Sequence, residues 1–234
     1  MSDDATSEHQ DALRARVIVV AGPSGSGKSR LCARLRSTFG TPVVNLDDFY
    51  KDGDDPTLPR RRIGPGHDIV DWDDPRSWSR EGALEALHDL CRYGVADLPV
   101  YDISHDGRTG HVRVSTDGSP YVVAEGLFAQ EVIAGCRERD LLADAVCVRN
   151  HRLLTFWRRL TRDLREHRKP PLVLLRRGWL LMRAEPDVVA HAVARGAIPM
   201  SPEQAFRRLS RLVERPRSPV CPVRAPAADS LGTL

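Results

Sequence analysis

Residues 16–29 read RVIVVAGPSGSGKS, and this stretch is the most informative part of the chain. It opens with a short apolar run that predicts a buried strand, and the residues from Lys28 to about Phe39 carry a helical pattern. Between the two, residues 22–29 match G-x-x-x-x-G-K-[ST] at every fixed position. A glycine-rich turn placed there lets backbone N–H groups point at phosphate oxygens, beside the positive end of the helix.

We expect this loop to bind the phosphates of a nucleotide, with ATP or GTP as the donor. Lys28 is expected to reach the β- and γ-phosphates and to assist catalysis, and the Ser29 hydroxyl is expected to ligate Mg²⁺. The residues that we assign to nucleotide binding on this basis are Gly22, Ser24, Gly25, Ser26, Gly27, Lys28 and Ser29. The loop alone indicates nucleotide binding and leaves the reaction open.

The rest of the chain alternates short apolar runs with helical patterns. Further strands are predicted at 42–46, 121–126 and 144–148, and helices at 79–91, 151–168, 174–184, 187–195 and 202–214. Strands in which apolar residues run continuously, without alternating with polar ones, are typical of a parallel sheet that is buried on both faces. Separated by helices, they predict an α/β three-layer sandwich, a parallel sheet flanked by helices on both faces. We expect one domain at 15–215, with a disordered leader at 1–14, a disordered Pro-rich tail at 216–234, and substrate-binding insertions at 51–78 and 98–118.

Composition narrows the class of protein. The chain has 234 residues, 41% of them hydrophobic and 29% charged, with a formal net charge of +3. That small charge predicts no nucleic-acid partner, and the apolar runs are far shorter than the ~20 residues that span a bilayer. The five cysteines are scattered without a C-x-x-C pair, which favours a reducing cytoplasm over a disulfide framework or a zinc site. Whether the chain forms a homo-oligomer is left open.

Carboxylates follow two of the predicted strands. Asp47 and Asp48 come directly after the strand at 42–46, and Glu125 ends the strand at 121–126. Ligands bind at the carboxyl ends of parallel strands, and a kinase needs a carboxylate there to accept the proton of the acceptor hydroxyl. Either aspartate could serve as that base, and Glu125 is a candidate for holding Mg²⁺.

Residues 151–183 are strongly basic, and this segment has three interpretations. It could be a solvated helical face, a nucleic-acid patch, or a lid whose arginines stabilise the charge that builds up during phosphoryl transfer. We favour a lid at about 151–170, formed by some of Arg158, Arg159, Arg162, Arg165 and Arg168.

Several short motifs, in the same order, resemble the uridine kinase (uridine–cytidine kinase) family of P-loop kinases. They are GPSGSGKS (22–29), LDDFYKD (46–52), DWDDP (71–75), LPVYDISH (98–105), VVAEGLF (122–128) and RRLTRD (158–163). The resemblance covers about residues 16–170. Two departures stand out: the segment between Tyr101 and His105 is one residue shorter than the family pattern, and the sequence after Pro170 has no clear counterpart.

The resemblance implies roles for individual residues. It makes Asp47 the catalytic base and Glu125 a magnesium-linked carboxylate. We expect Asp47 and Glu125 to converge with Ser29 around one Mg²⁺. The resemblance also implies that the acceptor is bound by Tyr50, Trp72, Asp73, Tyr101 and His105. In this assignment Asp73 binds the ribose and the rings stack on the base. It makes Arg158, Arg159 and Arg162 catalytic lid residues and places Arg168 on the nucleotide.

The function implied is phosphorylation of uridine or cytidine at the 5′ hydroxyl by ATP, giving UMP or CMP in pyrimidine salvage. Two alternatives remain open from the sequence. One is a P-loop kinase of another small acceptor, such as pantothenate or a sugar phosphate. The other is a non-catalytic nucleotide-binding regulator that uses its basic helices to hold a partner.

Overall fold

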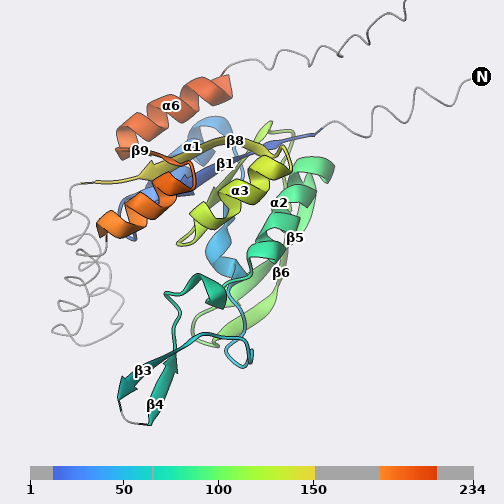
Figure 1. Ribbon diagram of the computed structural model, residues 1–234. Coiled ribbons are helices and arrows are strands. Elements are labelled where there is room, and N and C mark those ends of the chain that lie inside the picture. The colour runs from blue at the N-terminus through green and yellow to red at the C-terminus, as the bar shows by residue number, and fades with distance from the viewer. Residues whose placement is uncertain (1–12, 65, 151–184, 215–234) are drawn as a thin grey trace, which may run out of the picture.

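The computed structural model describes residues 13–64, 66–150 and 185–214. Its centre is a five-stranded sheet in the order β2-β7-β1-β8-β9 (Figure 1). The strands are β1 (Arg16–Ala21), β2 (Val43–Asn45), β7 (Tyr121–Glu125), β8 (Leu142–Val148) and β9 (Ile198–Met200). Every pairing within this sheet is parallel, which confirms the predicted α/β class.

The register brings the functional segments to one edge of the sheet. Val20 on β1 and Asn45 on β2 both pair with Glu125 at the end of β7. Since parallel strands present their carboxyl ends along the same edge, the loop after β1, the turn after β2 and Glu125 all begin there.

The two faces of the sheet have separate cores, because successive side chains of a strand point to opposite sides. Ile18 and Val20 pack with α1 (Lys28–Phe39) and α6 (Pro202–Glu214) on one face. Val17 and Val19 pack with α2 (Arg80–Tyr93) and α3 (Val132–Glu138) on the other. Burial on both faces explains the unbroken apolar run in β1.

Both insertions contain hairpins, which the sequence had indicated only as interruptions. The first holds β3 (Arg60–Gly64) and β4 (His67–Val70), and the second is formed by β5 (Val95–Asp102) and β6 (Gly107–Ser115). The second hairpin starts before the predicted boundary, because β5 continues directly from the Gly94 cap of α2. Short 3-10 turns complete this side of the fold: η2 (Leu46–Phe49), η3 (Pro75–Ser77) and η4 (Ala129–Glu131).

The C-terminal part of the described chain agrees with most of the prediction. Residues 185–194 are helical, and α6 covers the predicted 202–214. Strand β9 was missed, since three residues that include Pro199 are too few to give a periodic signal. The expected helices at 151–168 and 174–184, the lid, and nearly all of the expected leader and tail lie outside the described residues.

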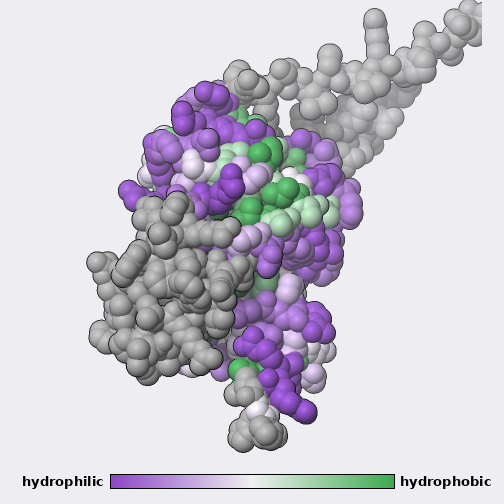
Figure 2. Space-filling model, turned by 60° about the vertical axis from the view of Figure 1, so that its left-hand side comes forward, coloured by the Kyte–Doolittle hydropathy of each residue, from purple (hydrophilic) through white to green (hydrophobic). Residues whose placement is uncertain are grey.

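The face seen in Figure 2 is mostly hydrophilic, with an apolar area enclosed by polar side chains. Within residues 13–64, 66–150 and 185–214, no helix has the length and apolar character to cross a bilayer.

Candidate active site

The backbone of the phosphate loop has a conformation that residues other than glycine rarely adopt. Gly22, Gly25 and Gly27 have φ values of 135°, 80° and 101°, in the region that favours glycine. A Cβ on Gly22 would also collide with the carbonyl oxygen of Val148. The fixed glycines of the motif are therefore required by a left-handed backbone and by the close approach of β8.

Lys28 lies buried within this loop. Its Nζ donates hydrogen bonds to the carbonyl oxygens of Gly22 at 2.8 Å and Pro23 at 3.2 Å. Burial lowers the pKa of Lys28, while the nearby Glu125 and Asp47 carboxylates oppose that shift. The ammonium group is thus held in the loop, within electrostatic reach of both carboxylates assigned to the site.

The three residues expected around a metal ion come together. The Ser29 hydroxyl donates to Glu125 Oε2 at 3.3 Å. Asp47 Oδ1 accepts the backbone N–H of Leu127 at 2.7 Å, which fixes its carboxylate beside the end of β7. Burial raises the pKa of Glu125, although its bond with Ser29 and the charge of Lys28 act in the opposite direction. A half-buried carboxylate with a raised pKa gains from a nearby cation.

The residues present fit a nucleotide with its metal ion. Ser26 is part of the phosphate loop, and its hydroxyl is buried with no hydrogen-bond partner among the described residues. Gly27, at the N-cap of α1, contributes no side chain to the first N–H groups of that helix. No three His, Cys, Asp or Glu side chains gather as a metal site in the described ranges. A hard cation here would be held by Ser29, Glu125 and Asp47 together with phosphate oxygens, as Mg²⁺ prefers.

The two neighbouring aspartates have different surroundings. Asp48 Oδ2 accepts from Asn45 Nδ2 at 3.0 Å, and Asp48 Oδ1 accepts from the backbone N–H of Tyr101 at 3.4 Å. Burial raises the pKa of Asp48. Asp48 therefore joins η2 to the β5–β6 hairpin, whereas Asp47 lies beside Glu125 and Lys28, where a reacting hydroxyl would meet the phosphates.

Three of the predicted acceptor residues form an aromatic cluster, Tyr50, Trp72 and Tyr101. The ring centroids of Tyr50 lie 5.8 Å from those of both Trp72 and Tyr101, and the Trp72–Tyr101 distance is 6.5 Å. The Tyr50 hydroxyl donates to the Trp72 carbonyl oxygen at 3.2 Å. The rings meet at interplanar angles of 79°, 48° and 64°, so they pack edge-on or tilted against one another and do not face each other as two walls of a cleft.

Carboxylates flank this cluster. Burial raises the pKa of Tyr50, and the charges of Asp47 and Asp73 raise it further. Burial also raises the pKa of Tyr101, with Asp106 and Asp52 adding to the shift. Asp73 is exposed beside the rings, as a ribose-binding carboxylate would need to be. The surroundings of the cluster are thus strongly acidic.

An ion pair joins the two insertions at the outer end of the site. The Arg108 guanidinium contacts Asp52 Oδ2 at 2.6 Å, and the backbone N–H of Arg108 donates to Asp52 Oδ1 at 2.7 Å. His105 bonds Asp102 Oδ2 through Nδ1 at 2.7 Å, and its side chain is 69% exposed. His105 and Arg108 line a shallow cavity of about 590 Å³ with Asp52 and Asp106. His105 lies at this rim rather than among the rings.

Sequence reasoning missed several residues that support the site. Asn150 Nδ2 donates to the Ser26 carbonyl oxygen at 2.9 Å, and Trp78 Nε1 donates to the Leu46 carbonyl oxygen at 2.6 Å. Phe128 packs on Tyr50 at 5.9 Å. Asn150 and Trp78 lie outside the motifs, and Phe128 lies in one that gave it no role; only folding brings the three to their partners. The predicted lid residues Arg158, Arg159, Arg162 and Arg168 lie outside the described residues.

A parallel sheet whose central strand leads into this loop, with carboxylates at the ends of two neighbouring strands, defines a P-loop nucleotide-binding protein of the kinase type. Comparison with known proteins makes the assignment narrower. Residues 17–169 match the family model described as the phosphoribulokinase / uridine kinase family. The chain belongs to this family.

Individual relatives agree with the family model. The uridine kinase of Geobacillus kaustophilus is 30% identical over 153 residues, which are 64% of this chain and 68% of that protein. The uridine kinase of Saccharomyces cerevisiae is 28% identical over 151 residues, 63% of this chain but 29% of that longer protein. Among solved structures, a putative fructose transport system kinase from Silicibacter shares the fold, with a TM-score of 0.53, 20% identity, and coverage of 80% of this chain and 87% of that one.

Proposed function

We propose that this chain transfers the γ-phosphoryl group of ATP to the 5′ hydroxyl of a pyrimidine nucleoside, uridine or cytidine, to give UMP or CMP. The observation that carries the proposal is the aromatic cluster of Tyr50, Trp72 and Tyr101 beside the Asp47 carboxylate. A flat pyrimidine needs an aromatic stacking face, and its sugar hydroxyls need carboxylate acceptors.

Charge separates the candidate acceptors. Pantothenate and sugar phosphates are anions, whereas uridine and cytidine are neutral at pH 7. The charges of Asp47 and Asp73 act on Tyr50, and those of Asp52 and Asp106 act on Tyr101. The Arg108 guanidinium at this end of the site is already paired with Asp52. With no unpaired cation among the described residues named here to balance an anionic acceptor, these carboxylates support a neutral one.

Each residue has a definite part in the proposed reaction. Lys28 and the loop N–H groups bind the phosphates, and Ser29, Glu125 and Asp47 hold Mg²⁺ beside them. Mg²⁺-ATP, when bound, supplies the phosphoryl group and a divalent charge next to it. Asp47 orients the acceptor hydroxyl and takes its proton, while Asp73 and the rings fix the nucleoside. Arg158, Arg159, Arg162 and Arg168 are proposed to close over the phosphates and exclude water.

The cellular setting is part of the proposal. The described cysteines Cys32, Cys91, Cys136 and Cys147 are free thiols, as in a reducing compartment. Together with the family membership, this supports a role in pyrimidine salvage in the cytoplasm.

The test is a coupled ADP-release assay on the purified chain with ATP or GTP as donor. Uridine and cytidine are compared with pantothenate and ribulose 5-phosphate. We expect turnover with the nucleosides and only background with the two anions. Turnover with an anion alone would overturn the proposed acceptor class, and no acceptor-stimulated turnover would favour the regulatory alternative.

Asp47→Asn and Asp48→Asn form a matched pair for the catalytic base. Removing a general base costs about 10²–10⁴-fold in rate, so Asp47→Asn should lose turnover on this scale while it still binds ATP. Asp48→Asn should keep most of the turnover and mainly raise the KM for the nucleoside, because Asp48 supports the hairpin that carries Tyr101. Loss of turnover in Asp48→Asn alone would reassign the base.

A further inference from the structure

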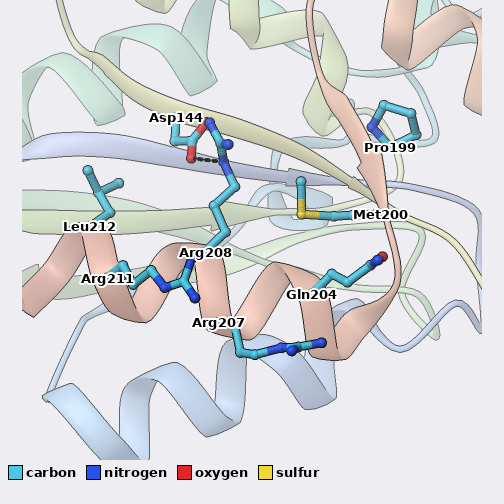
Figure 3. A pocket seen from close by; sticks show the side chains of 8 residues that line it. All are labelled: Asp144, Pro199, Met200, Gln204, Arg207, Arg208, Arg211 and Leu212. Carbon is cyan, nitrogen blue, oxygen red and sulfur yellow. Dashed lines mark hydrogen bonds and ion pairs between the residues drawn. The ribbon is translucent and has the colours of Figure 1, made fainter.

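A second pocket lies between α6 and the edge of the sheet. Its volume is about 660 Å³, in the range of sites that hold small organic ligands. Figure 3 shows Arg207, Arg208 and Arg211 of α6 around it, with Asp144 of β8 opposite. No residue assigned to the nucleotide or to the acceptor lines this pocket.

The charge in the pocket is unbalanced. Arg208 is paired with Asp144 through two hydrogen bonds, Nε to Oδ2 at 2.7 Å and Nη2 to Oδ1 at 3.1 Å. Among the described residues, no carboxylate forms an ion pair with Arg207 or Arg211, and both side chains are exposed. Two guanidinium groups one helical turn apart can bind the oxygens of a phosphate group, which their planar donors match.

The helix that carries these arginines is firmly anchored. Its Ala205 and Leu209 are buried in the core beneath it. Phe206 stacks on Phe39 of α1 at 6.3 Å, and the Arg34 guanidinium lies 3.5 Å from the centre of the Phe206 ring. The outward face of α6 is therefore a rigid platform, which reduces the entropy lost when a ligand binds.

Apart from Gln204, the rest of the lining is apolar, and its strand β9 is connected to the phosphate loop by hydrogen bonds. Pro199, Met200 and Leu212 give the pocket an apolar side. The Met200 carbonyl oxygen accepts the backbone N–H of Arg149 at 2.9 Å, and the next residue, Asn150, donates to the Ser26 carbonyl oxygen. A ligand that moves β9 would thus act on the nucleotide site through a short chain of hydrogen bonds.

We propose that this pocket binds a phosphorylated small molecule with an apolar or planar portion, and that its binding is coupled to the nucleotide site. The phosphate contacts Arg207 and Arg211, and the apolar portion packs on Met200 and Leu212. Because coupling between two sites is reciprocal, the ligand changes the affinity for ATP by the same factor by which ATP changes the affinity for the ligand.

The experiment measures AMP binding to the full chain by calorimetry while a non-hydrolysable ATP analogue saturates the nucleotide site, with adenosine as the unphosphorylated control. The double variant Arg207→Ala/Arg211→Ala is compared with Arg62→Ala/Arg113→Ala, which removes the same charge from two hairpin arginines that are 78% and 73% exposed. We expect AMP to bind the unaltered chain and the control alike. Charge-assisted bonds to two arginines predict that affinity falls about tenfold or more in the pocket variant.

Two results would overturn the inference. AMP binding that is equally tight in the pocket variant, or equally tight for adenosine, would show that the arginines do not form a phosphate site. AMP binding that depends on the arginines but leaves the affinity for a non-hydrolysable ATP analogue unchanged would refute the coupling. All four substituted arginines are exposed, so circular dichroism and thermal unfolding should match between the variants.

Discussion

Gly126→Ala should displace the proposed catalytic base without touching the phosphate loop. A Cβ at this position would lie 2.8 Å from Asp47 Oδ1 and 2.9 Å from Leu46 Cβ, where ordinary contacts begin near 3.4 Å. Leu46 is fully buried and cannot move aside easily. The Asp47 carboxylate must therefore shift by about 0.6 Å or more, and a misplacement of about 1 Å can cost on the order of 10²-fold in rate.

We expect kcat to fall by about tenfold to 10²-fold, with ATP affinity unchanged and with stability lowered by about 1–3 kcal/mol through overpacking. Steady-state kinetics with uridine, calorimetry with an ATP analogue and urea unfolding measure the three effects. Gly110→Ala is the matched control, since a Cβ there meets no atom within 4 Å. A folded Gly126→Ala protein with normal kcat would refute the assignment of Asp47.

Two further predictions concern carboxylates. Burial raises the pKa of Glu125, so its ionised form is a cost to folding that grows as the pH rises through that pKa. Compared with the unaltered chain, Glu125→Gln should therefore have a melting temperature that is raised more at pH 7 than at pH 4. The same variant should lose Mg²⁺-dependent turnover. A melting temperature at pH 7 below that of the unaltered chain would contradict this reasoning. Glu131 is buried between His191 at 2.6 Å and Arg195 at 3.0 Å. Glu131→Ala should cost about 1–3 kcal/mol in urea unfolding, because it leaves the Arg195 guanidinium and the His191 ring without their buried partner, and a loss below about 0.5 kcal/mol would show these contacts to be dispensable.

The acceptor region shows where motif reasoning was adequate and where it was not. The motifs pointed to Tyr50, Trp72 and Tyr101 separately, and the structure brings the three rings into contact. The motifs did not predict that Asp52 and Arg108 would tie the two insertions together, because a salt bridge over such a sequence separation has no periodic signal.

The sequence by itself determined the phosphate loop, its flanking strand and helix, and the α/β class, because these depend on local backbone requirements and on short-range hydrophobic patterns. Tertiary structure alone decided that Asp48 braces a hairpin while Asp47 lies beside Glu125, although the two residues are adjacent in the chain. It also decided that the arginines of α6 surround a pocket at the sheet edge. The reason is physical: each of these features depends on contacts between distant segments, which form only when the sheet and its helices pack together.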